Sequence, residues 1–198
     1  MGGEGAQRFI VYCLDRESGK ILWQHTAVSG KPKIRRHPKS THANPTPATD
    51  GGHLVALLGS EGLFAFNLNG KLLWKRDLGL LDSRFYRVPE AQWGFASSPV
   101  IHENMVIIQA DVQKNSFLAA FDVRTGKKLW RVRRSDVPTF STPAVVPYTG
   151  SGSASARHQV VVNGWKHICG YDVKTGKELW SLRSGGNIPV PTPVFSNG

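Results

Sequence analysis

One motif recurs four times along the 198-residue chain and limits the folds that the chain can adopt. Each copy has a short apolar run, then Asp or Asn, then a Gly-Lys turn, and a Trp four residues after the Gly. The paired glycines and tryptophans are Gly19/Trp23, Gly70/Trp74, Gly126/Trp130 and Gly176/Trp180. The Trp-to-Trp intervals are 51, 56 and 50 residues. Self-similarity with a period of about 40–50 residues predicts stacked repeat units such as propeller blades.

The chemistry of each motif predicts a β-hairpin. In the third copy, Phe117–Val123 and Lys128–Val132 are apolar and β-prone, and a turn ending in Gly126 lies between them. Gly tolerates positive φ, and an Asp side chain bonds its own backbone in such turns. The motif acids are therefore expected to form turns; they are Asp15, Asp122 and Asp172. Because an isolated hairpin is marginal in water, we expect all four tryptophans to be buried between neighbouring units.

A second repeated element, a Ser or Thr followed by Pro, recurs at a spacing similar to that of the Gly and Trp motif. It consists of Thr46-Pro47, Ser98-Pro99, Thr142-Pro143 and Thr192-Pro193. The prolines are 52, 44 and 50 residues apart, and each begins or lies in a short apolar run. Further apolar runs lie between the two series, at His53–Leu58, Met105–Gln109 and Gln159–Val162. Each unit thus has four short strands: A carries the Ser/Thr-Pro pair, B follows it, C runs up to the motif Asp or Asn, and D carries the Trp. This arrangement predicts an all-β chain of four-stranded antiparallel propeller blades.

The motif resembles a known repeat. Its pattern A-x-D-x-x-T-G-K-x-x-W, met at 120–130, is similar to the tryptophan-docking repeat of quinoprotein (pyrroloquinoline quinone, PQQ) propellers. The second copy departs from it, with Asn67 in place of Asp and one residue fewer. That superfamily includes quinone-dependent alcohol and glucose dehydrogenases and non-catalytic members such as the outer-membrane assembly lipoprotein. The resemblance implies a PQQ-like propeller in the periplasm or outside the cell.

The repeat boundaries predict one propeller domain over 1–198. We expect a partial blade at 1–28, blades at about 43–79, 95–133 and 139–183, and the start of a further blade at 188–198. Propellers close with roughly four to eight blades, so two arrangements are open. In the first arrangement, these blades are part of a larger ring of about seven or eight blades. In the other, Pro193–Phe195 joins the N-terminal strands in a four-bladed ring. Closure would lack a B strand, which favours the first arrangement, whose open blade edges are expected to self-associate.

Charge and strand order indicate where a partner binds. The net charge is +11, from 25 basic and 14 acidic residues, which favours an anionic partner. Alternating strands place the B–C and D–A connections on one face, here called the loop face, and the A–B and C–D turns on the opposite turn face. Loops on a rigid scaffold commonly carry function. The residues predicted to form a binding face are Arg35, Arg36, Trp93, Arg133, Arg134 and Trp165. We expect a protein or an anionic envelope component as the partner, with nucleic acid a weaker candidate.

The sequence gives little support for catalysis. Within the resembled family, alcohol dehydrogenases place adjacent cysteines over the quinone and hold Ca²⁺ with oxygen ligands. This chain has no Cys-Cys pair and no clustered carboxylates that suit a hard cation. His37 and His42 share a loop without a third ligand nearby. No catalytic, cofactor or metal residue is therefore assigned.

These observations favour a non-catalytic binding or scaffold propeller of the bacterial cell envelope. The alternative is part of a PQQ-dependent quinoprotein dehydrogenase with its cofactor residues in other blades, and PQQ and Ca²⁺ are expected only in that case. Neither a signal peptide nor an apolar run of membrane-spanning length occurs in the sequence.

Overall fold

The computed structural model describes residues 5–148, 157–184 and 186–196. Within these residues the protein is built from antiparallel β-sheets, with one short 3-10 helix at Gly59–Glu61. The sequence at 150–157 is rich in Gly, Ser and Ala, which predicts a flexible A–B insertion, and residues 150–156 lie outside the described part. The prediction of an all-β chain with four-stranded antiparallel blades is confirmed.

Four sheets follow one another along the chain, and we call them blades 1 to 4. Blade 1 contains β1 (Gln7–Leu14) and β2 (Ile21–Gly30). Blade 2 contains β3 (Ala48–Thr49), β4 (His53–Leu57), β5 (Leu63–Asn67) and β6 (Leu72–Arg76). Blade 3 contains β9 (Val100–His102), β10 (Met105–Ala110), β11 (Phe117–Asp122) and β12 (Lys128–Arg133). Blade 4 contains β13 (Ala144–Tyr148), β14 (Arg157–Asn163), β15 (His167–Asp172) and β16 (Glu178–Arg183).

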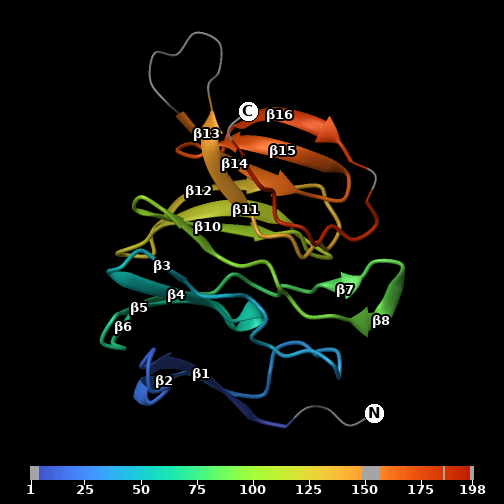
Figure 1. Ribbon diagram of the computed structural model, residues 1–198. Coiled ribbons are helices and arrows are strands. Elements are labelled where there is room, and N and C mark those ends of the chain that lie inside the picture. Colours follow the sequence, from blue (N-terminus) through green and yellow to red (C-terminus); the bar gives the residue numbers. More distant parts are fainter. Residues whose placement is uncertain (1–4, 149–156, 185, 197–198) are drawn as a thin grey trace.

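The blades are stacked in chain order, from β1–β2 at the bottom of Figure 1 to β13–β16 at the top. Within the described residues no strand pairs blade 1 with blade 4, and the sheets do not close into a ring. Large apolar side chains are exposed at both ends of the stack. They are Leu14, Ile21 and Leu22 on blade 1, and Leu182 on blade 4.

The C–D turns form as their sequence predicts. In blade 3, Asp122 Oδ1 accepts hydrogen bonds from the backbone N–H and the hydroxyl of Thr125, at 2.9 and 2.8 Å. Gly126 closes the turn at φ +66°, and its N–H donates to the Asp122 carbonyl. Asp172 repeats this arrangement with Thr175, and Asp15 repeats it with Ser18. Each turn is therefore held by its own side chains and needs no group from another blade.

The same glycines receive the tryptophan of the preceding blade. Trp74 Nε1 donates to the Val123 carbonyl at 2.8 Å, and its ring covers Gly126, where a Cβ atom would lie 2.6 Å from the indole. Trp130 does the same against blade 4, with Nε1 3.0 Å from the Val173 carbonyl and the ring over Gly176. Trp23 packs on Gly70 and donates to the Leu68 carbonyl. Glycine is thus required at these turns both for its φ and for the closeness of the ring.

The expectation that all four tryptophans are buried is wrong for two of them. Trp74 and Trp130 are buried, whereas Trp23 and Trp180 are half-buried. Among the described residues no turn of a further blade covers Trp180, and its Nε1 donates to Gln159 of its own blade. Trp180 therefore has the motif but not the contact between blades.

The hydrophobic core lies between blades rather than within one sheet. One cluster joins blade 2 to blade 3 through residues such as Val55, Leu63, Val106 and Phe121. A second joins blade 3 to blade 4, and a third joins blade 1 to blade 2. Neighbouring blades are also tied at the residues that precede the repeat prolines. Thr46 N–H donates to Ser98 Oγ, and Ser98 N–H donates to Thr142 Oγ1.

The A strand predicted at Pro193–Phe195 is absent, since residues 186–196 contain no strand. Pro189, Pro191 and Pro193 each lack an N–H donor, so the segment cannot form a regular ladder through them. It lies along blade 4 instead: Phe140 N–H donates to the Pro189 carbonyl, and Ser141 Oγ donates to the Pro191 carbonyl.

One further hairpin was not predicted. β7 (Arg84–Phe85) and β8 (Val88–Gln92) pair within the connection between blades 2 and 3, and they project to the right in Figure 1.

Candidate functional site

The B–C and D–A connections meet on one face, as strand order predicts. Gln113 N–H donates to the Asp82 carbonyl at 2.9 Å, which joins a B–C loop to the preceding D–A connection. Arg134 N–H donates to the Ser116 carbonyl, and Ser184 N–H donates to the Lys166 carbonyl, both between loops of these two kinds. The loop face is therefore one hydrogen-bonded surface, on the side of the β7–β8 hairpin in Figure 1.

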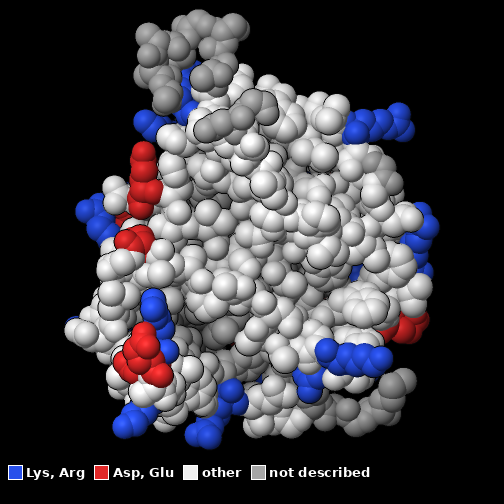
Figure 2. All heavy atoms as spheres, in the orientation of Figure 1, with Lys and Arg blue, Asp and Glu red and all other residues white. Residues whose placement is uncertain are grey.

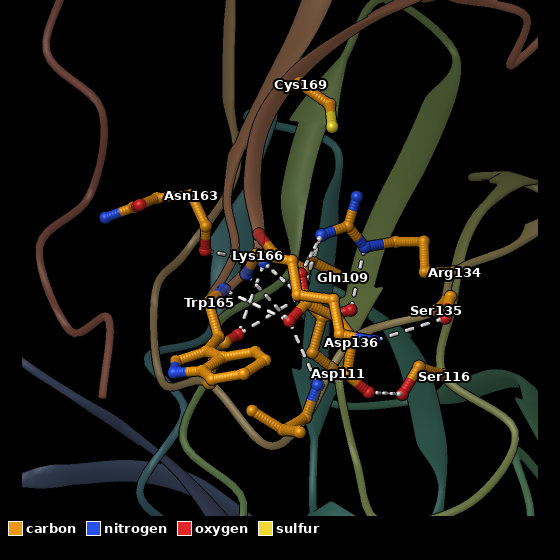
Figure 3. A network of polar contacts seen from close by, with 12 residues as sticks. Gln109, Asp111, Ser116, Arg134, Ser135, Asp136, Asn163, Trp165, Lys166 and Cys169 are labelled. Carbon is orange, nitrogen blue, oxygen red and sulfur yellow. Dashed lines mark hydrogen bonds and ion pairs between the residues drawn. The ribbon is translucent and has the colours of Figure 1, made fainter. Parts of the chain in front are cut away.

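A buried polar network lies beneath this face, where blade 3 meets blade 4 (Figure 3). Its centre is Arg134, which follows β12 directly and whose side chain is only 3% exposed. The guanidinium binds Asp111 through two nitrogens, at 2.7 and 3.2 Å, and reaches Asp136 at 3.3 Å. A third nitrogen donates to the Tyr171 hydroxyl at 2.8 Å. One cation thus holds groups from two loops of blade 3 and one strand of blade 4.

Burial and charge explain the titration behaviour of this network. Burial opposes the charged form of Arg134, but the two carboxylates, Asp111 foremost, raise its pKa above the ordinary value. Burial raises the pKa of Asp136, and repulsion from Asp111 adds to that rise, while Arg134 acts against it. Burial also raises the pKa of the Tyr171 hydroxyl. Since the cation is shared between two acids and each of its three nitrogens has a partner, the network is suited to holding blades together.

Other groups complete the network. Gln109 Nε2 donates to Asp111 at 2.8 Å and to the Asn163 carbonyl at 3.2 Å. Gly164 leaves room for the cluster, since a Cβ atom there would overlap Asp136 Oδ2. Asp136 Oδ1 in turn accepts from the N–H of Trp165. The loop that carries Trp165 is therefore shaped around Asp136.

The assignment of Arg134 to an exposed binding face is corrected by this geometry. Residues two apart on a strand point to the same side, and Trp130, Val132 and Arg134 alternate with the exposed Arg131 and Arg133. This alternation was visible in the sequence and would have placed Arg134 inward. The carboxylates that make such burial tolerable lie 23 residues before it and 2 after it.

The remaining predicted residues occupy separate parts of the loop face. Arg35 is exposed, whereas Arg36 is half-buried and donates to the carbonyls of His37, Pro38 and Ser40, so it organises its own loop. Trp93 is 43% exposed and stacks on His37, with ring centres 4.7 Å apart. Trp165 is half-buried, and its ring centre lies 5.4 Å from that of Tyr86 in the β7–β8 hairpin. The structure does not gather these residues into one patch.

Charge is distributed unequally over the surface. In Figure 2 the visible acidic residues gather mainly at the left, on the side of the A–B and C–D turns, whereas Lys and Arg occur on both sides. On the loop face, Asp82 is paired with Arg84 at 2.7 Å, and Asp111 and Asp136 are held by Arg134. Three acids of the loop face are thus paired internally, whereas Glu90 on β8 is exposed and has no ion pair among the described residues. Arg131 and Arg133, near the end of β12 that leads into this face, point outward.

The described part of the chain contains neither a metal-binding cluster nor a membrane-spanning helix. No group of three or more His, Cys, Asp or Glu side chains there is placed to hold a metal ion. The same part contains no helix long and apolar enough to cross a membrane.

Comparison with known proteins identifies relatives of the fold. A family model described as outer membrane protein assembly factor BamB matches residues 7–188. BamB from Moraxella catarrhalis superposes with a TM-score of 0.59 and 18% identity, over 88% of this chain and 43% of that one. The europium-containing methanol dehydrogenase gives 0.56 and 16%, over 90% and 38%. A quinohemoprotein alcohol dehydrogenase from Pseudomonas putida HK5 gives 0.55 and 16%, over 90% and 32%.

No curated protein sequence matches the chain. The chain spans less than half the length of each of the three structures. At such low identity the likeness to solved structures concerns the fold alone.

Proposed function

The chain belongs to the family of the outer membrane protein assembly factor BamB, and we propose that it is a non-catalytic propeller module that binds a partner through its loop face. The family includes an assembly factor, which supports a protein partner and a place in the bacterial envelope, on the periplasmic side. The Trp-to-Gly contacts between blades give a rigid base for the loops. The proposal therefore concerns a scaffold whose recognition lies in its connections.

The observation that carries this proposal is the internal pairing of three loop-face acids beside outward-pointing arginines. Asp111 and Asp136 are bound to a buried arginine, and Asp82 is bound to Arg84. In the described part of the chain, neither Arg131 nor Arg133 forms an ion pair, and both are exposed. Outward cations beside inward acids give the face a positive potential, which steers an anionic partner and favours its binding.

The competing function, part of a quinone-dependent dehydrogenase, is suggested by two of the structural neighbours. Hard cations such as Ca²⁺ need several oxygen ligands. The buried carboxylates of the loop face are already bound to Arg134, so this donor set does not fit such an ion. Reconstitution with PQQ and Ca²⁺, followed by dye-linked oxidation of alcohols and aldose sugars, is expected to give no turnover. Sustained turnover would establish the dehydrogenase instead.

A charge-reversal experiment tests the binding face. Arg131→Glu/Arg133→Glu changes two loop-face charges, and Lys127→Glu/Lys177→Glu makes the same change in net charge on the exposed turns. On an anionic resin at several salt concentrations, the loop-face variant should elute at clearly lower salt than the turn-face variant, because ion-pair contacts are screened by salt. Equal elution of the two variants would mean that the charge is diffuse and would overturn the choice of face.

A further inference from the structure

Two adjoining hollows begin at the loop face, the first where blade 2 meets blade 3 and the second along blade 3 alone. The first has a volume of about 500 Å³ and lies between residues 78–84 and residues 112–117. The second, of about 440 Å³, extends along β12 past Lys128 and Arg133. Both hollows have Asn115, Phe117 and Arg131 in their walls, so they form one continuous depression. We call this depression the basic groove.

The first hollow has an apolar floor. Leu78, Leu81, Val112 and Phe117 line it and are buried in the molecule. Leu80 lies at its edge and is 61% exposed, so apolar surface is left uncovered there. The hydrogen bond from Gln113 N–H to the Asp82 carbonyl holds the two walls together. A fixed apolar hollow of this size is suited to one or two apolar side chains.

Cations border this floor, and most of them have no acidic partner. The Arg131 guanidinium lies over the Phe117 ring, with its central carbon 3.8 Å from the ring centre, a contact that fixes its position. Arg84 is neutralised by Asp82. In the part of the chain that the structure describes, no carboxylate pairs with Lys114 or Arg131, nor with Lys128 or Arg133 of the second hollow. The groove therefore has apolar surface at one end and unpaired positive charge along the rest.

We propose that the basic groove binds a short acidic segment of a protein partner, with one apolar side chain in the first hollow and carboxylates against the cations. This proposal rests on the proposed function and specifies the chemistry of its partner. Arg131 suits a carboxylate because a guanidinium donates two parallel hydrogen bonds to it. Lys114 adds a second charge at the rim of the first hollow, and Lys128 and Arg133 continue the cationic surface into the second.

The shape of the groove favours a peptide over other anions. A polysaccharide or a nucleic acid backbone offers charge but has no apolar side chain to place in the first hollow. A membrane surface is broad, and proteins that lie on it insert protruding apolar residues. Here the floor residues are buried and Lys114 and Arg131 stand in the walls of the same hollow, so a ligand must project a side chain into it. Charge complementarity and this recess together select an acidic segment that carries an apolar residue.

The test uses a fluorescent peptide that contains Asp and Glu residues and one Leu, and the purified chain is titrated by fluorescence polarisation. Binding should weaken about tenfold or more in Lys114→Glu/Arg131→Glu, because charge-assisted hydrogen bonds to the peptide carboxylates are replaced by repulsion. The matched variant Lys127→Glu/Lys174→Glu lies on the turn face and should stay within about twofold. Replacing the peptide Leu with Ser should weaken binding roughly fivefold or more, because the burial of an apolar side chain is lost.

Three results would overturn this inference. One is equal binding by the Leu and Ser peptides, which would reduce the groove to a charge patch. Another is binding to phosphatidylglycerol vesicles without binding to peptide, which would assign the face to a membrane. The third is equal loss of binding in the turn-face control. If peptide binding is absent while Arg131→Glu/Arg133→Glu still elutes early from the anionic resin, the groove fails and the proposed function stands. If the peptide does not bind and Arg131→Glu/Arg133→Glu elutes like the turn-face variant, both the groove and the proposed function fail.

Discussion

Blades 3 and 4 meet along one interface, and the two ends of that interface are held by opposite chemistry. At the turn end, the Trp130 ring covers Gly176 and its N–H reaches the Val173 carbonyl. At the loop end, Arg134 binds two carboxylates and a tyrosine hydroxyl. The two side chains are four positions apart and point to the same side of the chain. One end is an apolar contact with backbone, and the other is a buried ionic network.

The difference shows which contacts a repeat can copy. Trp130 needs only a glycine turn and a carbonyl from the next blade, and Trp74 finds the same groups at Gly126 and Val123. Arg134 needs specific partners from three other parts of the chain, and no second copy of this network occurs in the described residues. The apolar end therefore recurs at successive junctions, whereas the ionic end distinguishes one junction from the others.

The largest effect is expected at the ionic end. Arg134→Ala leaves two buried carboxylates without their cation, which should lower the free energy of unfolding by about 3–5 kcal/mol. Arg133→Ala, one residue earlier and exposed, is the control and should change it by less than about 0.5 kcal/mol. Urea denaturation of the two variants measures both values. A similar small loss in each would show that the network does not hold the blades together.

At the apolar end, Trp130→Ala should lower the free energy of unfolding by about 3 kcal/mol, because a buried aromatic ring is removed. Trp180→Ala provides the comparison within the motif. Trp180 is half-buried and bonds its own blade, so its loss should cost only about 1 kcal/mol, the value typical of an average substitution. Urea melts of both variants test this ranking, which equal losses would contradict.

The smallest expected effect is a pH dependence of stability, and it comes from a histidine pair at the turn end of this interface. His102 and His158 meet across the blades with ring centres 4.6 Å apart, near Glu103, Arg157, Asp172 and Lys174. Burial lowers the pKa of His102 below its ordinary 6.5, and the neighbouring His158 lowers it further. The unfolded chain then binds more protons at this residue than the folded chain does. The stability that this residue contributes is therefore present above about pH 6.5 and is lost as the pH falls below that value.

Unfolding free energies of the native chain and His102→Gln at pH 7.5 and pH 5.5 measure this contribution. The native chain should lose more stability than the variant, by at most about 1.4 kcal/mol per pH unit for one proton. His53→Gln is a control at the A–B turn of blade 2, where the half-buried imidazole lies 2.9 Å from Asp50. If His102→Gln loses as much stability as the native chain, this histidine contributes nothing to the pH dependence.

The sequence by itself determined the repeated parts of the molecule. The period of the Gly and Trp motif indicated stacked four-stranded units, and the turn acids Asp122 and Asp172 act as their local chemistry requires. These features depend on residues a few positions apart, or on one unit meeting the next in the same way each time. Short-range chemistry and exact repetition can be read from a single chain.

Tertiary structure alone decided what does not repeat. Strand alternation in the sequence points Arg134 inward, but only the fold brings Asp111 and Tyr171 to it from distant positions and so stabilises its buried charge. Within the described residues, Trp180 donates to Gln159 of its own blade and Pro193–Phe195 forms no strand. The basic groove arises only where the loops after β6 and β10 come together. Each of these outcomes depends on a partner group whose position is set by the packing of whole blades, and short-range sequence patterns carry no record of that position.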